Sequence, residues 1–316
     1  MEGQRVLPTR YEADRFYFVL TTERGDTLML FTDTGGGLFV YAESAERTGL
    51  AVLGAEAIRR RFGAGIPDQA LREIGGRLVE LPAGPAGLEL PPLRTPFGEA
   101  RVLPVRPPGA GESGERAALR DGMLGQGWFA GRVWTFDYPG QRLLVQDALN
   151  AATVADHIEM KLGFRTSPDG TRQTNYPRMQ IVVNADTLDM LFDTGATTLL
   201  TPEALQALGD GGSDIRATSF ITASMFDRWS ARHPNWRVIE NAERDNGMAM
   251  IEARDVVIAG HTIARVWFTR RADSNFHEWM SQWMDRRIEG AVGGNALRYF
   301  RITVDYPNAV AWFRPR

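Results

Sequence analysis

The sequence predicts an all-β protein of two similar lobes, with a cleft between the lobes. Three observations favour this fold class. The chain has 316 residues, more than a single hydrophobic core usually organises. Its apolar residues fall mostly in short alternating runs between turn residues, which is typical of strands. A short apolar segment near the start of the chain also returns, nearly unchanged, in its second half.

The repeated segment reads DTLMLFTDTG at Asp26–Gly35 and DTLDMLFDTG at Asp186–Gly195. An apolar run, a short helical pattern and a glycine follow each copy. Further on, DGMLGQGWFAGRVWTFDYPG (Asp121–Gly140) is matched by EGAVGGNALRYFRITVDYPN (Glu289–Asn308), with about eight more residues before it in the second half. A repeat of this length predicts two similar lobes.

We expect the first lobe at residues 1–150, an interlobe connection at 151–177 and the second lobe at 178–316. The segment PVRPPGAGESGE predicts a flexible loop inside the first lobe, and RTSPDGTRQTNYP predicts a linker or surface turn between the lobes.

The local patterns are rich in strands. RFYFVLTTERGDTLMLF and RMQIVVNADTLDMLF each predict strand, turn and strand. WRVIENAERDNGMAMIEARDVVIAGHTIARVWF predicts a meander with turns at 245–247 and 259–260. The clearest helical pattern is SNFHEWMSQWMDRR, and it predicts a surface helix packed on the second lobe. A lid or partner-docking role is the alternative for this helix. Its apolar face comprises Phe276, Trp279, Met280, Trp283 and Met284.

Each repeated segment ends in Asp-Thr-Gly, directly after an apolar run. Burying such a carboxylate costs several kcal/mol unless hydrogen-bond donors satisfy it. The glycine permits a tight turn that leaves N–H groups free to face the carboxylate, and the threonine hydroxyl can bond to the facing loop. If the two loops meet, Asp33 and Asp193 come together and share one proton.

With these motifs, the chain resembles aspartic peptidases of the pepsin/retropepsin type, in their single-chain, two-lobe form. LFDTGATTLLTPEAL is similar to the second-lobe motif of pepsin-like enzymes, and DGMLG and GAVGG resemble the family's apolar-apolar-glycine signature. The resemblance covers Arg15–Gln146 and Arg178–Arg316. It implies hydrolysis of a peptide or protein substrate by a water activated between Asp33 and Asp193. It further implies paired threonines that join the loops and glycines that form the turns: Thr34, Thr194, Gly35 and Gly195.

Several residues depart from the pepsin pattern. Gly36 and Ala196 stand where pepsins usually carry a hydroxyl, and Thr32 replaces an apolar residue. No tyrosine occurs between Tyr41 and Tyr138, so no flap tyrosine is assigned. REIGGRLVELP is faintly similar to a retroviral flap at residues 74–76, but we expect an ordinary turn there.

Composition bears on the remaining function classes. A net charge of −3 argues against nucleic-acid binding. The absence of cysteine excludes disulfides, zinc fingers and thiol nucleophiles. No apolar run reaches the roughly 18 residues of a membrane span. The first residues lack a signal-peptide core, so we expect a cytoplasmic protein unless a removed signal directed it to the periplasm or outside the cell.

The histidines are not spaced as metal ligands, so we expect no metal and no organic cofactor. We also expect a monomer whose two lobes form one site. Two other function classes stay open. One is a catalytically weak or inactive peptide-binding protein of the same fold. The other is a glycosidase, which would need its two carboxylates about 5 to 10 Å apart.

Overall fold

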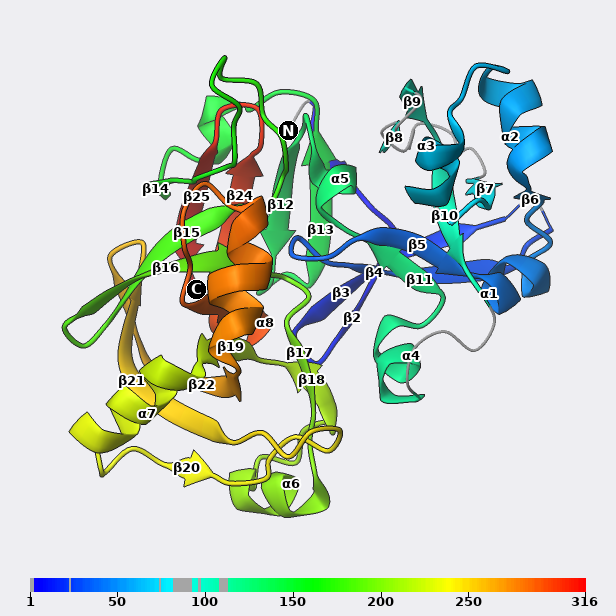
Figure 1. The fold of residues 1–316 in the computed structure, drawn as a ribbon. Coiled ribbons are helices and arrows are strands. Elements are labelled where there is room, and N and C mark those ends of the chain that lie inside the picture. Colours follow the sequence, from blue (N-terminus) through cyan, green and yellow to red (C-terminus); the bar gives the residue numbers. More distant parts are fainter. Residues whose placement is uncertain (1–2, 23, 74, 82–92, 96–97, 108–112) are drawn as a thin grey trace.

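The computed structural model describes residues 3–22, 24–73, 75–81, 93–95, 98–107 and 113–316. Strands dominate, as the sequence predicts, and most of them form three large sheets (Figure 1). Part of the predicted flexible loop, residues 108–112, lies outside the described residues, as does residue 74 of the segment compared with a flap.

The first half of the chain forms an eight-stranded sheet, drawn in blue and teal on the right of Figure 1. In spatial order its strands are β2 (Thr9–Glu12), β3 (Arg15–Thr21), β4 (Thr27–Thr32), β11 (Gly122–Leu124), β5 (Leu38–Tyr41), β10 (Val102–Arg106), β7 (Leu78–Glu80) and β6 (Val52–Leu53). Beside this sheet lie helices α1 (Ala42–Arg47), α2 (Ala55–Phe62), α3 (Asp68–Glu73) and α4 (Ser113–Leu119), and a small hairpin of β8 (Leu93–Thr95) and β9 (Gly98–Ala100).

The second half forms a seven-stranded sheet. Its strands in spatial order are β15 (Arg178–Val183), β16 (Asp186–Phe192), β23 (Gly290–Val292), β19 (Ser219–Thr222), β22 (His261–Arg271), β21 (Met250–Ile258) and β20 (Val238–Ile239). Strand β15 also pairs with β21, which curls this sheet back on itself. The other elements are β17 (Thr197–Leu199), β18 (Ile215–Ala217), α6 (Pro202–Leu208), α7 (Ala223–Arg232) and α8 (Gly294–Leu297).

The two sheets share one arrangement of five strands. The order β3-β4-β11-β5-β10 in the first half matches β15-β16-β23-β19-β22 in the second. The directions match too: β11 and β23 run parallel to β4 and β16, and antiparallel to β5 and β19. The predicted strand-turn-strand segments are confirmed, with Gly25 and Asn184 at positive φ in the turns.

One correspondence differs from the sequence match. The strand, helix and glycine predicted after each Asp-Thr-Gly are present, as β5 and α1 in one half and β17 and α6 in the other. However, β17 pairs only with β18, and β19 takes the place in the sheet that β5 holds in the first half. Local pattern predicts a strand but not its partner, because pairing depends on residues distant in the sequence.

A six-stranded sheet joins the two halves. Its order is β1 (Arg5–Val6), β13 (Arg142–Gln146), β12 (Val133–Asp137), β24 (Phe300–Asp305), β25 (Val310–Pro315) and β14 (Ile158–Lys161). At its centre β12 pairs with β24, and the hydroxyls of Thr135 and Thr303 lie 2.9 Å apart. The predicted connection contributes β14 and a short 3₁₀ turn, η1 (Ala151–Thr153). The lobe boundaries at 150 and 178 stay a prediction.

Aromatic side chains fill the core beside this sheet. Trp128 and Phe129 of α5 (Gln126–Phe129) pack on Trp134, and the two tryptophan rings are 4.4 Å apart. The Trp134 indole donates to the Phe129 carbonyl at 2.9 Å, so its polar group is satisfied inside the core. Core residues of both halves belong to one contiguous cluster, so the sheet and its aromatics hold the lobes in fixed relation.

The predicted surface helix takes a different form. Residues Asn275–Met280 form a π-helical turn, η2, and Ser281–Trp283 a 3₁₀ turn, η3. Phe276, Met280 and Met284 are buried, whereas Trp279 and Trp283 are 65% and 42% exposed. A π-helix bonds i to i+5 and takes more residues per turn than an α-helix. Trp279, three residues after Phe276 in this turn, therefore leaves the buried face, whereas Trp283 lies in the 3₁₀ turn that follows. The segment packs on the second half of the chain as predicted, but through three of the five apolar residues and not all of them.

Among the described residues, no helix has both the length and the apolar content needed to cross a membrane.

The Asp-Tyr-Pro motifs end β12 and β24 in matching turns. Asp137 accepts the Gly140 N–H at 3.0 Å, and Asp305 accepts the Asn308 N–H at 2.9 Å. Asp137 also binds Arg142 and Arg301, each at 2.7 Å. Burial raises the pKa of Asp137, but these hydrogen bonds and the arginine charges outweigh it and leave that pKa below its usual range.

We expect Asp137→Ala to lower the free energy of unfolding by about 3 kcal/mol at pH 7, because Arg301 loses its buried partner. The folded pKa is depressed, so the stabilisation is present above the unfolded pKa of about 4 and is lost as pH falls further. Urea unfolding from pH 7 to pH 3 measures this. Asp156→Ala is the control, since its ion pair with Arg314 is exposed and solvent screens such a pair. Equal losses in the two variants would contradict the prediction.

Candidate active site

Asp33 and Asp193 lie at the ends of equivalent strands. Asp33 follows β4 and Asp193 follows β16. The Asp33 N–H donates to the Leu124 carbonyl of β11 at 3.0 Å, and the Asp193 N–H donates to the Val292 carbonyl of β23 at 3.0 Å. The two apolar-apolar-glycine segments therefore hold the backbone of both aspartates in the same way.

Four hydrogen bonds between Thr34 and Thr194 and the facing strands join the two loops; we call them the crossed threonine bonds. The Thr34 hydroxyl donates to the Phe192 carbonyl at 2.6 Å and accepts the Thr194 N–H at 3.0 Å. The Thr194 hydroxyl donates to the Thr32 carbonyl at 3.2 Å and accepts the Thr34 N–H at 3.2 Å. Both threonines are fully buried. Each hydroxyl thus satisfies one donor and one acceptor of the opposite half.

The crossed threonine bonds bring the two carboxyl groups into hydrogen-bonding contact. The Gly35 N–H donates to Asp33 at 2.8 Å, and the Gly195 N–H donates to Asp193 at 2.9 Å. A β-carbon on Gly35 would lie 2.8 Å from the Asp193 carboxyl carbon, and one on Gly195 would lie 2.0 Å from that of Asp33. Each glycine is therefore required by the aspartate of the opposite loop.

The electrostatics of the pair follow from its burial. Both aspartates are 8% exposed. Burial, the charge of Asp33 and the hydrogen bond with Asp33 raise the pKa of Asp193 well above its usual range. Burial also raises the pKa of Asp33, although hydrogen bonds from Asp193, Gly35 and Gly36 oppose this. The pair therefore keeps one proton at pH values where isolated aspartates are ionised.

The residues after the two motifs offer the aspartates no hydroxyl. A β-carbon on Gly36 would lie 2.4 Å from the Met123 sulfur and 2.5 Å from an Asp33 carboxyl oxygen. The Met123 thioether therefore fills the space that a side chain at position 36 would need. The Thr197 hydroxyl donates to the Gly195 carbonyl at 2.9 Å.

Thr32, the polar residue before the first aspartate, has its hydrogen bond satisfied within the sheet. Its hydroxyl donates to the Phe16 carbonyl at 2.9 Å. The departure from an apolar residue at this position thus leaves no unpaired buried group.

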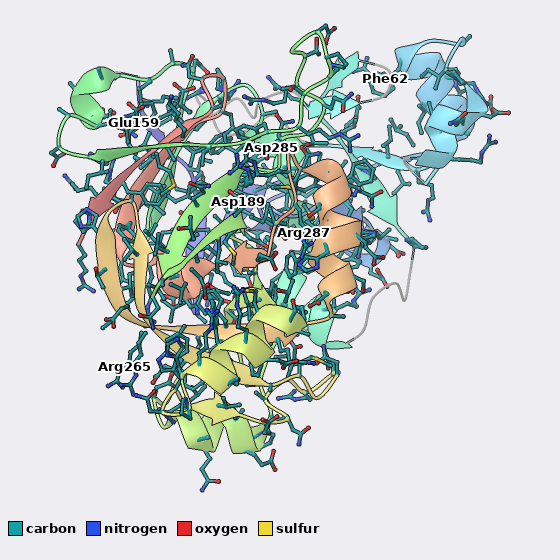
Figure 2. All side chains as sticks on the ribbon, turned by 60° about the vertical axis from the view of Figure 1, so that its left-hand side comes forward. Phe62, Glu159, Asp189, Arg265, Asp285 and Arg287 are labelled. Atoms are coloured by element: carbon teal, nitrogen blue, oxygen red, sulfur yellow. The ribbon has the colours of Figure 1, made fainter. Side chains whose placement is uncertain are left out.

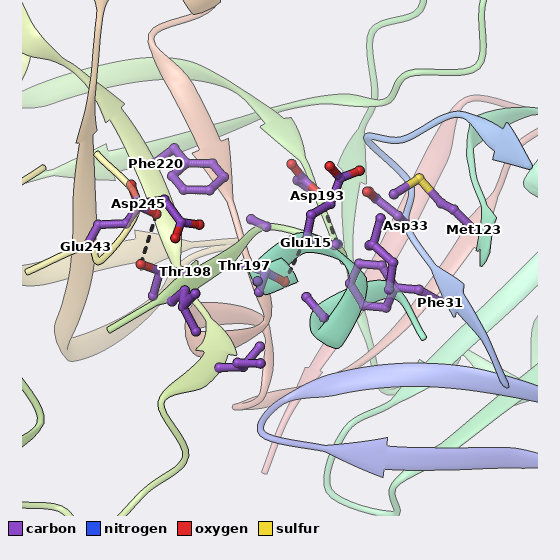
Figure 3. A pocket seen from close by; sticks show the side chains of 17 residues that line it. Phe31, Asp33, Glu115, Met123, Asp193, Thr197, Thr198, Phe220, Glu243 and Asp245 are labelled. Atoms are coloured by element: carbon purple, nitrogen blue, oxygen red, sulfur yellow. Dashed lines mark hydrogen bonds between the residues drawn. The ribbon is translucent and has the colours of Figure 1, made fainter. Parts of the chain in front are cut away.

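A cavity of about 340 Å³ opens over both aspartates, and residues of both halves line it (Figure 3). Glu115 of α4 and Met123 come from the first half, and Thr197, Phe220 and Asp245 from the second. A polypeptide segment that reached the aspartates would therefore contact both halves.

The structure does not bring every candidate to this cavity. Gly75 and Gly76 close the C-terminal end of α3, where their N–H groups donate to Arg72 and Leu71 carbonyls. This agrees with an ordinary turn, and neither glycine lines the cavity at the aspartates. Among the described residues, no three histidine, aspartate or glutamate side chains are grouped so as to hold a metal ion.

Sequence reasoning missed two residues near the aspartates. Met123 is the middle residue of the DGMLG signature, so its place beside Asp33 could have been read from that match. Tyr176 lies in the predicted linker and carries no motif. Burial and the charges of Asp33 and Asp193 raise the pKa of Tyr176 to about 12.

No protein-family model and no curated protein matches the chain. Among solved structures it is similar to an aspartic proteinase from Irpex lacteus, with a TM-score of 0.53 and 12% identity over 99% of this chain and 97% of that one. A retropepsin-like aspartic protease from Rickettsia conorii also matches, with a TM-score of 0.29 and 13% identity over 49% of this chain and 89% of that one. The first likeness covers nearly all of both chains. The protein therefore has the two-lobed, mostly β fold of an aspartic proteinase.

Proposed function

We propose that the protein is an aspartic endopeptidase that cleaves peptide bonds with a water activated between Asp33 and Asp193. The observation that supports this best is the contact of two buried carboxyl groups, which cannot both ionise easily. Their direct contact also argues against a glycosidase, which needs its carboxylates about 5 to 10 Å apart.

One shared proton gives each aspartate of the pair a role. The ionised aspartate accepts a proton from the attacking water, while the protonated aspartate donates a hydrogen bond to the peptide carbonyl oxygen. Water oxygen bonds to the carbonyl carbon and forms a gem-diol. The carbon–nitrogen bond then breaks, the nitrogen leaves with a proton from the pair, and the other product is a carboxylic acid. This is the general chemistry of aspartic proteases, in which two aspartates share one proton.

The neighbouring groups support these roles without entering the reaction. The N–H groups of Gly35 and Gly195 hold one oxygen of each carboxyl in place. The crossed threonine bonds keep the two loops from separating. Because the catalytic groups are already in position, they need not reorganise during the reaction, and this lowers the activation free energy of cleavage.

Asp33→Asn and Asp193→Asn should each reduce peptide cleavage to below about 1% of wild type, since either change removes a carboxyl that moves a proton. The measurement is cleavage of a mixed peptide library between pH 3 and pH 7, with and without a statine-type inhibitor, whose hydroxyl imitates the gem-diol. Asp210→Asn is the control, since Asp210 pairs with Arg216 and does not line the cavity. Undiminished cleavage in either first variant would place the chemistry elsewhere. Wild-type protein that binds the library without cutting it would favour the inactive peptide-binding alternative.

The same pair should make stability depend on pH. The folded pKa of Asp193 is raised, so its contribution to stability is present below the unfolded pKa of about 4 and is lost as pH rises through the folded pKa. We therefore expect Asp193→Asn to be more stable than wild type at pH 7 by about 1 kcal/mol or more, and to lose this advantage near pH 4. Urea unfolding at both pH values measures this, and a pH-independent difference would contradict it.

The rate of cleavage should show a bell-shaped dependence on pH, because activity needs one proton on the pair. Hydroxyl hydrogen bonds favour an ionised carboxylate, and Gly36 and Ala196 supply none, so both limiting pKa values should be high. We expect an optimum at roughly pH 4 to 6 rather than near pH 2. The measurement is kcat/KM against pH on one library-derived peptide.

A substitution at Ala196 tests the physical reason for that optimum. Ala196 already carries a β-carbon, and its N–H bonds to the Asp193 carboxyl. Ala196→Ser adds a hydroxyl there and should move the acidic limb of the profile to lower pH. Ala196→Val, which enlarges the side chain without adding a hydroxyl, is the control and should leave the limb in place. An optimum below pH 3 in the wild type, or identical limbs in both variants, would contradict this explanation.

A further inference from the structure

The aspartate pair lies between two pockets that differ in chemistry. The Glu115 pocket is the cavity of about 340 Å³ in Figure 3, lined by Phe31, Gly195 and Glu115 among others. The Trp279 pocket has about 380 Å³ and is lined by Leu191, Gly35 and Trp279 among others. Both reach Asp193.

The two pockets have equivalent relations to the two catalytic loops. Phe31 and Leu191 hold the same place in the repeat, two residues before the aspartates, and Gly35 and Gly195 do so two residues after them. One pocket combines Phe31 with Gly195, and the other combines Leu191 with Gly35. Each pocket is also bordered by the short helix that precedes an apolar-apolar-glycine strand, α4 before β11 and η2 before β23. A peptide crossing the aspartates would thus place the side chains on either side of the cleaved bond in different pockets.

The walls of the Trp279 pocket are mostly apolar. Leu191, Phe220, Phe276 and Met280 line it together with Trp279. The guanidinium of Arg271, its one charged side chain besides Asp193 among the described residues, is bound to Glu243 at 2.6 and 2.7 Å and lies 4.1 Å from the ring centre of Phe220. The charge of Arg271 is therefore already neutralised by Glu243, and one face of its guanidinium is covered by the Phe220 ring.

Trp279 is held in place although its side chain faces solvent. Its neighbours Phe276 and Met280 are buried in a cluster with Leu191, Met284, Ile288 and Ala291. After the helix, Asp285 binds Arg178 at 2.7 Å, and Arg178 also binds Asp189 of β16 at 2.6 Å (Figure 2). A tryptophan that is 65% exposed on an anchored segment leaves a large apolar surface uncovered beside the aspartates.

The Glu115 pocket also has apolar walls, among them Phe31, Leu119 and Ile215, and Phe220 lines both pockets. It differs in also being lined by the carboxylates of Glu115 and Asp245. Glu115 binds Arg106 at 2.8 Å and is partly exposed, and Asp245 is exposed. A large apolar side chain that filled this pocket would remove water from these two carboxylates without replacing their hydrogen bonds, which is unfavourable.

We propose that the Trp279 pocket selects a large apolar side chain, aromatic above all, on one side only of the cleaved bond, and that Trp279 determines this selectivity. The inference rests on the proposed peptidase function. An aromatic side chain in the pocket would cover the Trp279 indole and meet the rings of Phe220 and Phe276 in tilted contacts, which add to the gain from burial. In the Glu115 pocket, loss of water from Glu115 and Asp245 would offset such a gain.

The test compares three peptides that share one cleavage site taken from the library. One carries phenylalanine before the cleaved bond and alanine after it, one has these two residues exchanged, and one has alanine at both positions. The wild type should cleave one phenylalanine peptide with a kcat/KM at least about 10-fold above that of the other two. Trp279→Ala should remove that preference, lowering kcat/KM at least about 5-fold more on the preferred phenylalanine peptide than on the double-alanine peptide.

Trp283→Ala is the matched control, because Trp283 lies on the same segment, is 42% exposed and lines neither pocket. It should retain the preference. Equal cleavage of the two phenylalanine peptides by the wild type, or an equal loss on all three peptides in Trp279→Ala, would overturn the proposal.

If the wild type cleaves none of the three peptides, the proposed peptidase function fails. Calorimetric measurement of peptide binding then tests the selectivity of the Trp279 pocket instead. Tighter binding of one phenylalanine peptide, weakened by Trp279→Ala alone, supports the proposal, and equal binding of all three overturns it.

Discussion

The crossed threonine bonds are the interaction on which the site depends. They connect backbone groups of one half to side chains of the other, and all four lie in the interior, where a lost partner costs more than it would at the surface. Two carboxyl groups in contact repel whenever both are ionised, so the aspartates supply no attraction of their own at neutral pH. Thr34 and Thr194 hold the loops against this repulsion, and the shared proton relieves it.

The rest of the fold fixes where these loops can be. Strands β11 and β23 bind the N–H of each aspartate, and the six-stranded sheet joins the two halves through β12 and β24. At that junction, equivalent residues of the two halves bind each other, as the hydroxyls of Thr135 and Thr303 do. Equivalent strands of the two halves are paired in the six-stranded sheet and end in equivalent loops. Asp33 and Asp193 therefore meet at one point.

The sequence predicted the parts of the molecule where the alternation of apolar residues indicates a strand and the same segment occurs in both halves of the chain. The ends of β4 and β16, the turns at Gly25 and Asn184 and the meeting of Asp33 with Asp193 all follow from one repeated motif. Partners that lie far along the chain could not be predicted this way. The pairing of β17 with β18, and the π-helical turn that exposes Trp279, depend on contacts that no short segment contains. The DGMLG signature predicts that Met123 lies near Asp33. It does not predict that the Met123 thioether fills the space beside Gly36, because that contact depends on the fold.

The halves share a backbone arrangement, yet the proposed reaction needs two aspartates that behave differently. The hydrogen bonds to the two carboxyls are equivalent, because Gly35 and Gly36 bond to Asp33 as Gly195 and Ala196 bond to Asp193. The side chains beside them differ. Met123 occupies a strand position whose equivalent in the second half is Ala291, paired with Leu191 as Met123 is with Phe31. A symmetric backbone places the two carboxyls in contact, and unlike side chains surround them. Equivalent positions of the two halves also border two pockets whose other side chains differ. The matching backbone thus accounts for the geometry of the site, and the unlike side chains account for the selectivity proposed for its pockets.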